Sequence, residues 1–301
     1  MSITGSDTGA SRFSPLIAWL CAGVILALAT WLCGSYLSPY LMRLAILTAI
    51  YICLAVCYNL VITEAGQFHL GFMAYFAVGA YAVAIPTTRF GWDFFPALLL
   101  SIGVVGIFTI VLGFLLLRFR GDYLSVVSLA AAEIMRLAVA NWRDVTGGHQ
   151  GLPGVPAPVM FGKEFHEQQY YLYGAVALAF VTALTAWILG RHGAGLAWRA
   201  IRQNERAAKA FGLQTAAYKQ LSFQVSGLFC GLAGALYASY QTIVDPSLFV
   251  IDGTVLLLTI VILGGGTLAG LVAAALVVIN LPEITRVFDQ YRMLLLGALF
   301  V

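Results

Sequence analysis

The sequence predicts an all-α, polytopic integral membrane protein, and its composition and apolar pattern carry this prediction. Apolar residues make up 61% of the 301 residues, whereas charged residues make up only 10%. A soluble domain is typically about 25% charged. The apolar runs are continuous and do not alternate, which excludes a β-barrel, and several reach the roughly 20 residues that a helix needs to cross a bilayer. We therefore expect one transmembrane domain over residues 1–301.

The predicted membrane segments follow one another along almost the whole chain. They are residues 16–37, 41–62, 70–88, 96–117, 124–140, 170–189, 220–243, 254–281 and 293–301. The first run is longer than the apolar core of a signal peptide, so we expect a membrane helix there. The last run would form about 14 Å of helix, too short to span. With one run split, the count becomes nine to ten segments.

The run 254–281 is longer than one membrane helix needs to be and contains a glycine triplet. Gly264, Gly265 and Gly266 are consecutive, and a glycine in a helix interior costs about 1 kcal/mol relative to alanine. We expect the helix to break at this triplet. In transporters, interrupted helices at matching positions of an internal repeat mark the substrate pathway. Close packing of helices at small residues is the alternative.

A second interruption is predicted at residues 63–71, a polar and glycine-rich joint between two apolar runs. Its sequence resembles the stretch around the glycine triplet, which indicates an internal repeat. Gln67 and His69 are its candidate functional residues. They would either hydrogen-bond a substrate in the pathway or satisfy the backbone groups that a broken helix leaves free.

Residues 190–219 form a helical loop that is unusually basic. The loop holds six of the sixteen Lys and Arg residues, against Glu205 as its one acid. We expect a single helix that ends at Gly212 as the residue after the C-cap. A basic stripe and an apolar stripe run along it, formed by Arg199, Arg202, Arg206 and Lys209, and by Trp198, Ile201, Ala208 and Phe211. Glu205 lies in the apolar stripe and needs a donor from outside the helix.

The distribution of basic residues predicts the orientation of the chain. With the N-terminus in the cytoplasm, residues 1–15, 63–69, 118–122 and 190–219 lie inside and hold nine basic residues, against four outside. We expect the loop 190–219 to dock a cytoplasmic partner, and a helix lying on anionic lipid is the alternative. The candidate coupling residues are Arg199, Arg202, Glu205, Arg206, Ala208 and Gly212.

Several motifs together resemble permeases of the branched-chain amino acid type of ABC importer, and most of all the larger permease of the pair. They are R-A-I-R-Q-N-E-R-A-A-K-A-F-G-L in the loop, Y-N-L-V-I-T-E-A-G-Q-F-H-L-G-F-M at the first joint and N-W-R-D-V-T-G-G-H-Q-G-L-P-G-V-P after the run 124–140. The likeness covers residues 40 to 290 approximately. There are departures: the importer signature E-A-A-x-x-x-G has one extra residue between Glu205 and Gly212, and Phe72 replaces a residue that is usually polar.

This resemblance implies a translocation subunit in a bacterial inner membrane, with branched-chain or other hydrophobic amino acids as the solute. It implies a second permease subunit, cytoplasmic ATP-binding subunits and a periplasmic substrate-binding protein as partners. Urea or short amides remain open as solutes. A rival hypothesis is a self-sufficient secondary transporter that uses Glu133 as a proton or sodium site.

Two charged residues are predicted inside a membrane helix. Glu133 and Arg136 lie three residues apart within the run 124–140. Ionisable residues at such depth point to function, here the substrate pathway. A purely structural ion pair within the helix is the alternative.

The loop 141–169 is expected on the external side, and its Gly- and Pro-rich stretch predicts a defined, non-helical shape. Such a shape suits the docking of a binding protein, and an ordinary connecting loop is the alternative. The candidate residues are Thr146, Gly147, Gly148, Gly151 and Pro153.

Other function classes find no support in the sequence. The net charge of +3 does not favour nucleic-acid binding, and no His, Cys or acidic residues have metal-ligand spacing. No cofactor is expected. The motif G-x-x-x-x-G-K-[ST] does not occur, so we expect ATP hydrolysis in a separate subunit and not in this chain.

Overall fold

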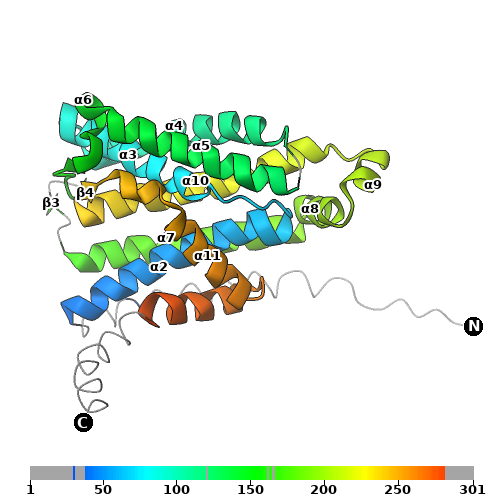
Figure 1. The fold of residues 1–301 in the computed structure, drawn as a ribbon. Coiled ribbons are helices and arrows are strands. Elements are labelled where there is room, and N and C mark those ends of the chain that lie inside the picture. The colour runs from blue at the N-terminus through cyan, green and yellow to red at the C-terminus, as the bar shows by residue number, and fades with distance from the viewer. Residues whose placement is uncertain (1–29, 31–37, 120, 161–162, 165–166, 282–301) are drawn as a thin grey trace, which may run out of the picture.

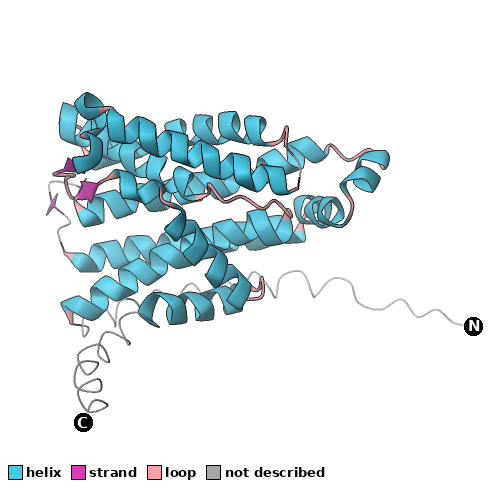
Figure 2. Cartoon of the chain, viewed as in Figure 1, coloured by secondary structure: helices cyan, strands magenta, loops and turns pink. Residues whose placement is uncertain are grey.

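The computed structural model describes residues 30, 38–119, 121–160, 163–164 and 167–281. Nearly all of the described chain is helical (Figure 2). The long helices are α2 (Pro39–Asn59), α3 (Met73–Phe90), α4 (Phe94–Leu116), α5 (Asp122–Asn141), α7 (Gln168–Arg191), α10 (Thr215–Gln241), α11 (Ile251–Leu263) and a following helix at Leu268–Leu281. The short elements are η1 (Leu60–Glu64), α6 (Arg143–Thr146), η2 (Gly148–Gln150), β1 (Leu152–Pro153), β2 (Val159–Met160), β3 (Lys163–Glu164), α8 (Gly193–Gln203), α9 (Glu205–Ala210), β4 (Ile243–Val244) and η3 (Pro246–Phe249).

Five described helices are long and apolar enough to cross a membrane. They are Pro39–Glu64, Phe94–Leu116, Asp122–Asn141, Gln168–Arg191 and Thr215–Gln241. The all-α prediction is therefore confirmed, and these helices match predicted runs in place and order. The predicted runs 16–37 and 293–301 lie outside the described residues, apart from Thr30.

The buried centre of the bundle is formed by α3, which packs against α4 and α10. Glycines allow α3 and α10 to approach to backbone contact. A Cβ atom on Gly79 would lie 2.0 Å from the carbonyl oxygen of Gly231, and one on Gly234 would lie 1.9 Å from that of Phe76. Small residues at helix crossings maximise packing where no water drives association, so these glycines have a structural role.

Both predicted interruptions are confirmed. The chain leaves α11 at Leu263, turns at residues 264–266 with positive φ at Gly265 (59°) and Gly266 (74°), and re-enters a helix at Leu268. At the other interruption, α2 passes into the π-helical turn η1, and residues 65–72 then lead irregularly into α3.

The loop after α5 and the loop that contains α8 and α9 lie at opposite ends of the bundle (Figure 1). At one end, β1 pairs with β4 in antiparallel register, with Leu152 opposite Val244. At the other end, α8 and α9 project beyond the long helices (Figure 1). That these two ends lie on opposite sides of a membrane stays a prediction.

Candidate functional site

The loop 190–219 folds as two short helices, and the predicted single helix is wrong. The backbone of Asn204 is extended, with φ −158° and ψ 101°, and separates α8 from α9. Its side-chain oxygen accepts a hydrogen bond of 3.1 Å from the Ala207 amide, so Asn204 is the N-cap of α9. The predicted basic stripe is thereby divided between the two helices.

Gly212 ends α9 as predicted. Its φ of +86° is left-handed, and the Gly212 amide donates to the carbonyl of Lys209 while the Leu213 amide donates to that of Ala208. These two bonds define a Schellman motif, in which glycine carries no steric cost. The predicted end of the helix at Gly212 is therefore correct, although the helix is not continuous across Asn204.

The inner face of α8 packs on the membrane bundle. Trp198 is fully buried and clusters with Leu60 and Ala65, and its indole nitrogen donates a 2.7 Å hydrogen bond to the Tyr218 carbonyl. Phe211 does not join this face: it is 88% exposed. The prediction of one continuous apolar stripe is wrong, because the turn at Asn204 gives α9 a different direction.

Glu205 receives its hydrogen bonds mainly from α10, in agreement with the need for donors outside its own helix. Its Oε2 lies 2.8 Å from Nζ of Lys219, and its Oε1 lies 3.4 Å from the hydroxyl of Thr215. Lys209 of α9 adds a contact of 3.2 Å. Burial raises the pKa of the Glu205 carboxyl, but the Lys219 and Lys209 ammonium groups outweigh burial and leave the pKa below its ordinary value.

The basic side chains of α8 point toward η1. A terminal guanidinium nitrogen of Arg202 donates to the carbonyl of Thr63, and Arg199 lies 3.8 Å from the carboxylate of Glu64. Arg199 also donates to the carbonyl of Gly190 at 3.1 Å. These two arginines therefore hold α8 against the bundle.

The outward side of the loop is hollowed where α8 meets α9. The hollow has a volume of ≈ 460 Å³ and is lined by Gln203, Asn204, Glu205, Arg206 and Lys209. Arg206 is exposed and forms no hydrogen bond or ion pair with any described residue. Ala208, by contrast, is buried. Among the predicted coupling residues, Arg206 thus differs from the others, which contact the bundle or hold the loop in its shape.

Gln67 and His69 are buried in the first joint and make different hydrogen-bond contacts there. The Gln67 amide donates a 3.1 Å hydrogen bond to the carbonyl of Ala65, so it satisfies backbone of the joint. The His69 ring lies within 3.4 Å of the Tyr75 hydroxyl through Nε2, while its buried Nδ1 has no hydrogen-bond partner in the described chain.

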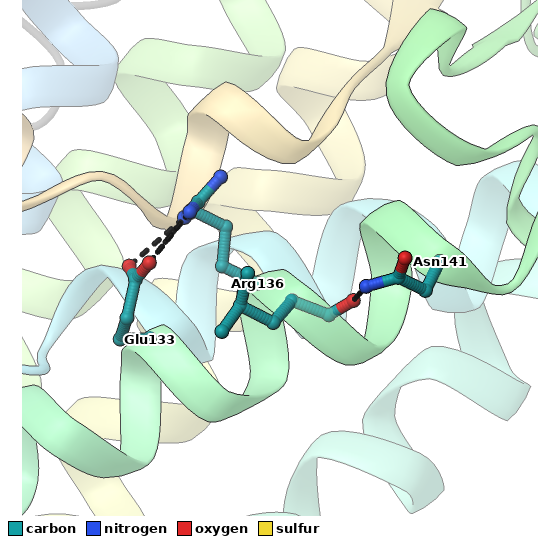
Figure 3. Close-up of polar contacts among 4 residues, drawn as sticks. Glu133, Arg136 and Asn141 are labelled. Atoms are coloured by element: carbon teal, nitrogen blue, oxygen red, sulfur yellow. Dashed lines mark hydrogen bonds and ion pairs between the residues drawn. The ribbon is translucent and has the colours of Figure 1, made fainter.

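Glu133 and Arg136 form a bidentate ion pair on α5 (Figure 3). The distances are 2.9 Å from Nε of Arg136 to Oε2 of Glu133 and 2.5 Å from the terminal nitrogen to Oε1. The Glu133 side chain is 49% exposed and the Arg136 side chain 27%. The pair therefore lies on a surface of a membrane-spanning helix and not inside the bundle that the described residues form.

The loop that follows α5 is built by local hydrogen bonds. The Thr146 hydroxyl donates to the carbonyls of Val139 and Trp142, at 2.5 and 2.7 Å. The candidate glycines all have positive φ values, at Gly147, Gly148 and Gly151. Pro153, in β1, is exposed. The predicted non-helical shape is wrong for the first part of the stretch, because α6 ends at Thr146 and residues 148–150 form the 3-10 turn η2. The glycines with positive φ end these short turns, and Thr146 is a buried internal support.

Sequence reasoning missed Asn204, Lys219 and Thr63. Asn204 carried a readable signal, since Asn is a preferred N-cap and Glu205 follows it in the first helical turn. Lys219 and Thr63 carried none, because their roles depend on contacts between elements distant in sequence. Among the described residues, no group of three or more His, Cys, Asp or Glu side chains could hold a metal ion.

Comparison with known proteins gives a family match over most of the chain. The model of the family described as "Branched-chain amino acid transport system / permease component" matches residues 40–301. The chain belongs to this permease family. The family describes a transport component, and together with the apolar helices it makes the chain a multi-pass membrane protein.

Relatives of this permease include the high-affinity branched-chain amino acid transport system permease proteins LivM of Salmonella typhimurium and Escherichia coli K12. Each is 33% identical over 282 residues, which cover 86% of this chain and 66% of the relative. The guanosine ABC transporter permease protein NupQ of Bacillus subtilis is 34% identical over 90 residues, 29% of this chain and 27% of NupQ. No solved structure matches the chain.

Proposed function

We propose that this permease is the translocation subunit of an ATP-driven importer and that the α8–α9 loop couples it to a separate ATPase. The observation that carries the proposal is the two-sided construction of the loop. Trp198 and Arg202 anchor its inner side to the bundle, while its outer side presents a hollow bordered by Arg206 and Lys209. A partner that pushes on the outer side would move the attached helices as one unit.

The coupling residues divide into two roles in this proposal. Arg206 and the rim of the hollow contact the ATPase, whereas Arg199, Arg202, Glu205, Ala208 and Gly212 keep the loop in the shape that fits the partner. Charged groups across an interface contribute mainly to specificity and to the rate of association. A second permease subunit, two ATP-binding subunits, an external substrate-binding protein and an inner-membrane location complete the proposed assembly.

The substrate pathway would use the two interrupted helices and the charged face of α5. Broken helices present free backbone groups to a polar solute. The partly exposed Glu133–Arg136 pair would be costly against lipid, so we place this face of α5 toward a water-filled path. Gln67, His69 and the glycines 264–266 border the joints. On the other side, the stretch Thr146–Pro153 would receive the binding protein.

The solute is proposed to be a branched-chain or other hydrophobic amino acid, since both LivM relatives carry that description. The match to NupQ shows that a similar permease sequence occurs in a protein named for guanosine transport. The amino acid assignment is therefore tested separately, by measuring which solutes a companion binding protein retains. Retention of urea or an amide in place of leucine, isoleucine or valine would contradict it.

Coupling is tested by co-purification and by uptake in reconstituted vesicles. Arg206→Glu should reduce retention of the ATP-binding subunits by about tenfold, as expected for loss of a close interfacial charge contact. Arg89→Glu reverses an exposed charge at the far end of α3 and serves as the matched control. Uptake by this chain alone, driven by an ion gradient and abolished by Glu133→Gln, would instead support the secondary transporter.

A further inference from the structure

The π-helical turn η1 is one of the places where the α8–α9 loop meets the membrane bundle, beside its contacts with α7 and α10. Arg202 donates to the Thr63 carbonyl, and Arg199 lies beside the Glu64 carboxylate. The buried ring of Trp198 packs on Leu60 at the start of the turn. Thus α8 contacts η1 through a hydrogen bond, an ion pair and an apolar contact.

The same turn contacts the glycine break between α11 and the helix Leu268–Leu281. The side-chain amide of Asn59, directly before η1, donates to the carbonyl of Gly266 at 3.4 Å. A Cβ atom on Gly266 would lie 2.8 Å from the methyl group of Thr63. Thr63 therefore touches α8 through its carbonyl and the glycine break through its side chain.

The first joint begins at the end of η1 and is held by the same arginine. Gly66, with φ +67°, lies so close to Arg202 that a Cβ atom would be 3.0 Å from the Arg202 Cγ. Gln67 and His69 follow within three residues. Both interrupted parts of the bundle are thus in contact with η1 or continuous with it, and α8 and α10 contact it as well.

From these contacts we infer that Arg202 and Asn59 are positioning residues for transport, which link α8 to the glycine break through η1. The inference deepens the proposed function and rests on it. A displacement of α8 carries Thr63 with it, and Thr63 and Asn59 then displace Gly266. A π-helical turn suits this role because such turns are rare and are found frequently at functional sites. Coupling between sites needs a contiguous set of contacts of this kind and a direct test.

The test compares uptake per ATP hydrolysed in the full transporter, reconstituted with its second permease, ATP-binding and binding-protein subunits. Arg202→Met keeps the Cβ and Cγ atoms that contact Gly66 but loses the donor to Thr63. We expect uptake per ATP to fall about tenfold, within the 5- to 150-fold range of coupling between sites. Retention of the ATP-binding subunits should fall less than in Arg206→Glu, because Trp198 still holds α8 on the bundle. Arg202→Lys keeps a donor and should recover most of the uptake.

Asn59→Leu provides an independent measurement inside the bundle. It removes the amide that donates to Gly266 and should lower uptake per ATP by a similar factor. Thr182→Val is its control, because it removes a buried hydroxyl at the α2–α7 contact, where Thr182 bonds Cys53, without touching η1. The double variant Arg202→Met/Asn59→Leu should have no lower uptake per ATP than the single variant with the lower uptake, because both changes interrupt the same chain of contacts.

The glycine break itself supplies a matched pair. An alanine at position 265 or 266 is strained because both glycines have positive φ, but only at Gly266 would the new Cβ meet Thr63. Gly266→Ala should therefore reduce uptake per ATP well below that of Gly265→Ala. Equal loss in this pair, normal uptake per ATP in Arg202→Met, or multiplicative losses in the double variant would each overturn the inference.

A failure of the proposed function would give other results than a failure of the further inference. A wild-type complex without ATP-dependent uptake, or full retention of ATP-binding subunits by Arg206→Glu, would contradict the importer proposal itself. If only the further inference is wrong, wild-type uptake still depends on ATP, but uptake per ATP does not change when the contact between Arg202 and Thr63 is removed.

Discussion

Glu205 illustrates how a single carboxylate determines the position of α9. It bonds Lys219 and Thr215, both near the start of α10. The side chain of Lys219 is only 9% exposed, whereas that of Glu205 is 26% exposed. A buried ammonium group without a partner is costly, so Lys219 depends on Glu205 more than Glu205 depends on Lys219.

Replacing Glu205 by Gln should destabilise the protein. The loss in free energy of unfolding should fall between the ~0.2–1 kcal/mol of an exposed pair and the ~3–5 kcal/mol of a buried pair that loses one partner. Thermal unfolding in detergent measures it. The double variant Glu205→Gln/Lys219→Met should recover stability, because no buried charge then remains. If the double variant is less stable than Glu205→Gln, the charge pair is not the cause.

The effect of Glu205→Gln should depend on pH. The pKa of Glu205 is lower in the folded protein than in the unfolded chain, so its contribution to stability is complete above the unfolded value of ~4.3 and is lost as pH falls through the folded value. The difference in Tm between wild type and Glu205→Gln should therefore be constant near neutral pH and shrink in acid. A difference that persists well below the carboxyl range would contradict the assignment.

At the level of elements, the loop 190–219 owes its shape to the turn at Asn204. Without the turn, α9 would continue in the direction of α8 and would not reach Lys219 and Thr215 of α10. The N-cap of α9 and the Schellman motif at Gly212 fix both ends of a helix of six residues. Such a short helix is not stable alone, so its caps and its contact with α10 hold it together.

Replacing Asn204 by Ala should loosen α9 selectively. Loss of an N-cap costs about 1 kcal/mol, which should increase amide hydrogen exchange across residues 205–211 while α8 stays protected by its buried Trp198. Asn204→Asp keeps a capping oxygen and is the matched control. Unchanged exchange in Asn204→Ala, or equal increases in both variants, would show that the cap does not hold α9.

Across the whole molecule, the bundle separates two ends that carry candidate sites. The β1–β4 pair and the Thr146 turn lie at one end, and α8 and α9 lie at the other (Figure 1). Positive residues predict that the α8–α9 end is cytoplasmic. The orientation of the proposed import path depends on this assignment.

Orientation is tested by labelling single introduced cysteines in whole cells with a membrane-impermeant thiol reagent. Phe211→Cys, at a position 88% exposed, should react only after the cells are permeabilised, while Trp142→Cys, at a position 60% exposed, should react in intact cells. The unsubstituted chain measures the background of its own cysteines, of which Cys53, Cys57 and Cys230 are buried. The reverse labelling pattern would place α8 and α9 outside.

The sequence by itself determined the helical membrane class, the order of the described spans, both interruptions and the end of α9 at Gly212. These features are local, because each follows from the apolarity of a run or from the backbone freedom of glycine within a few residues. The family resemblance was also readable from contiguous motifs, and the family match over residues 40–301 confirms it.

Only the tertiary structure decided which side chains of the loop face the bundle and which face outward. Arg202 bonds Thr63 across 139 positions of sequence, and Asn59 bonds Gly266 across 207. No periodicity along one helix contains such partners, since they are set by how α2, η1 and the glycine break pack together. The physical reason is that a buried polar group takes the donor or acceptor that folding brings to it, wherever in the chain that group originates.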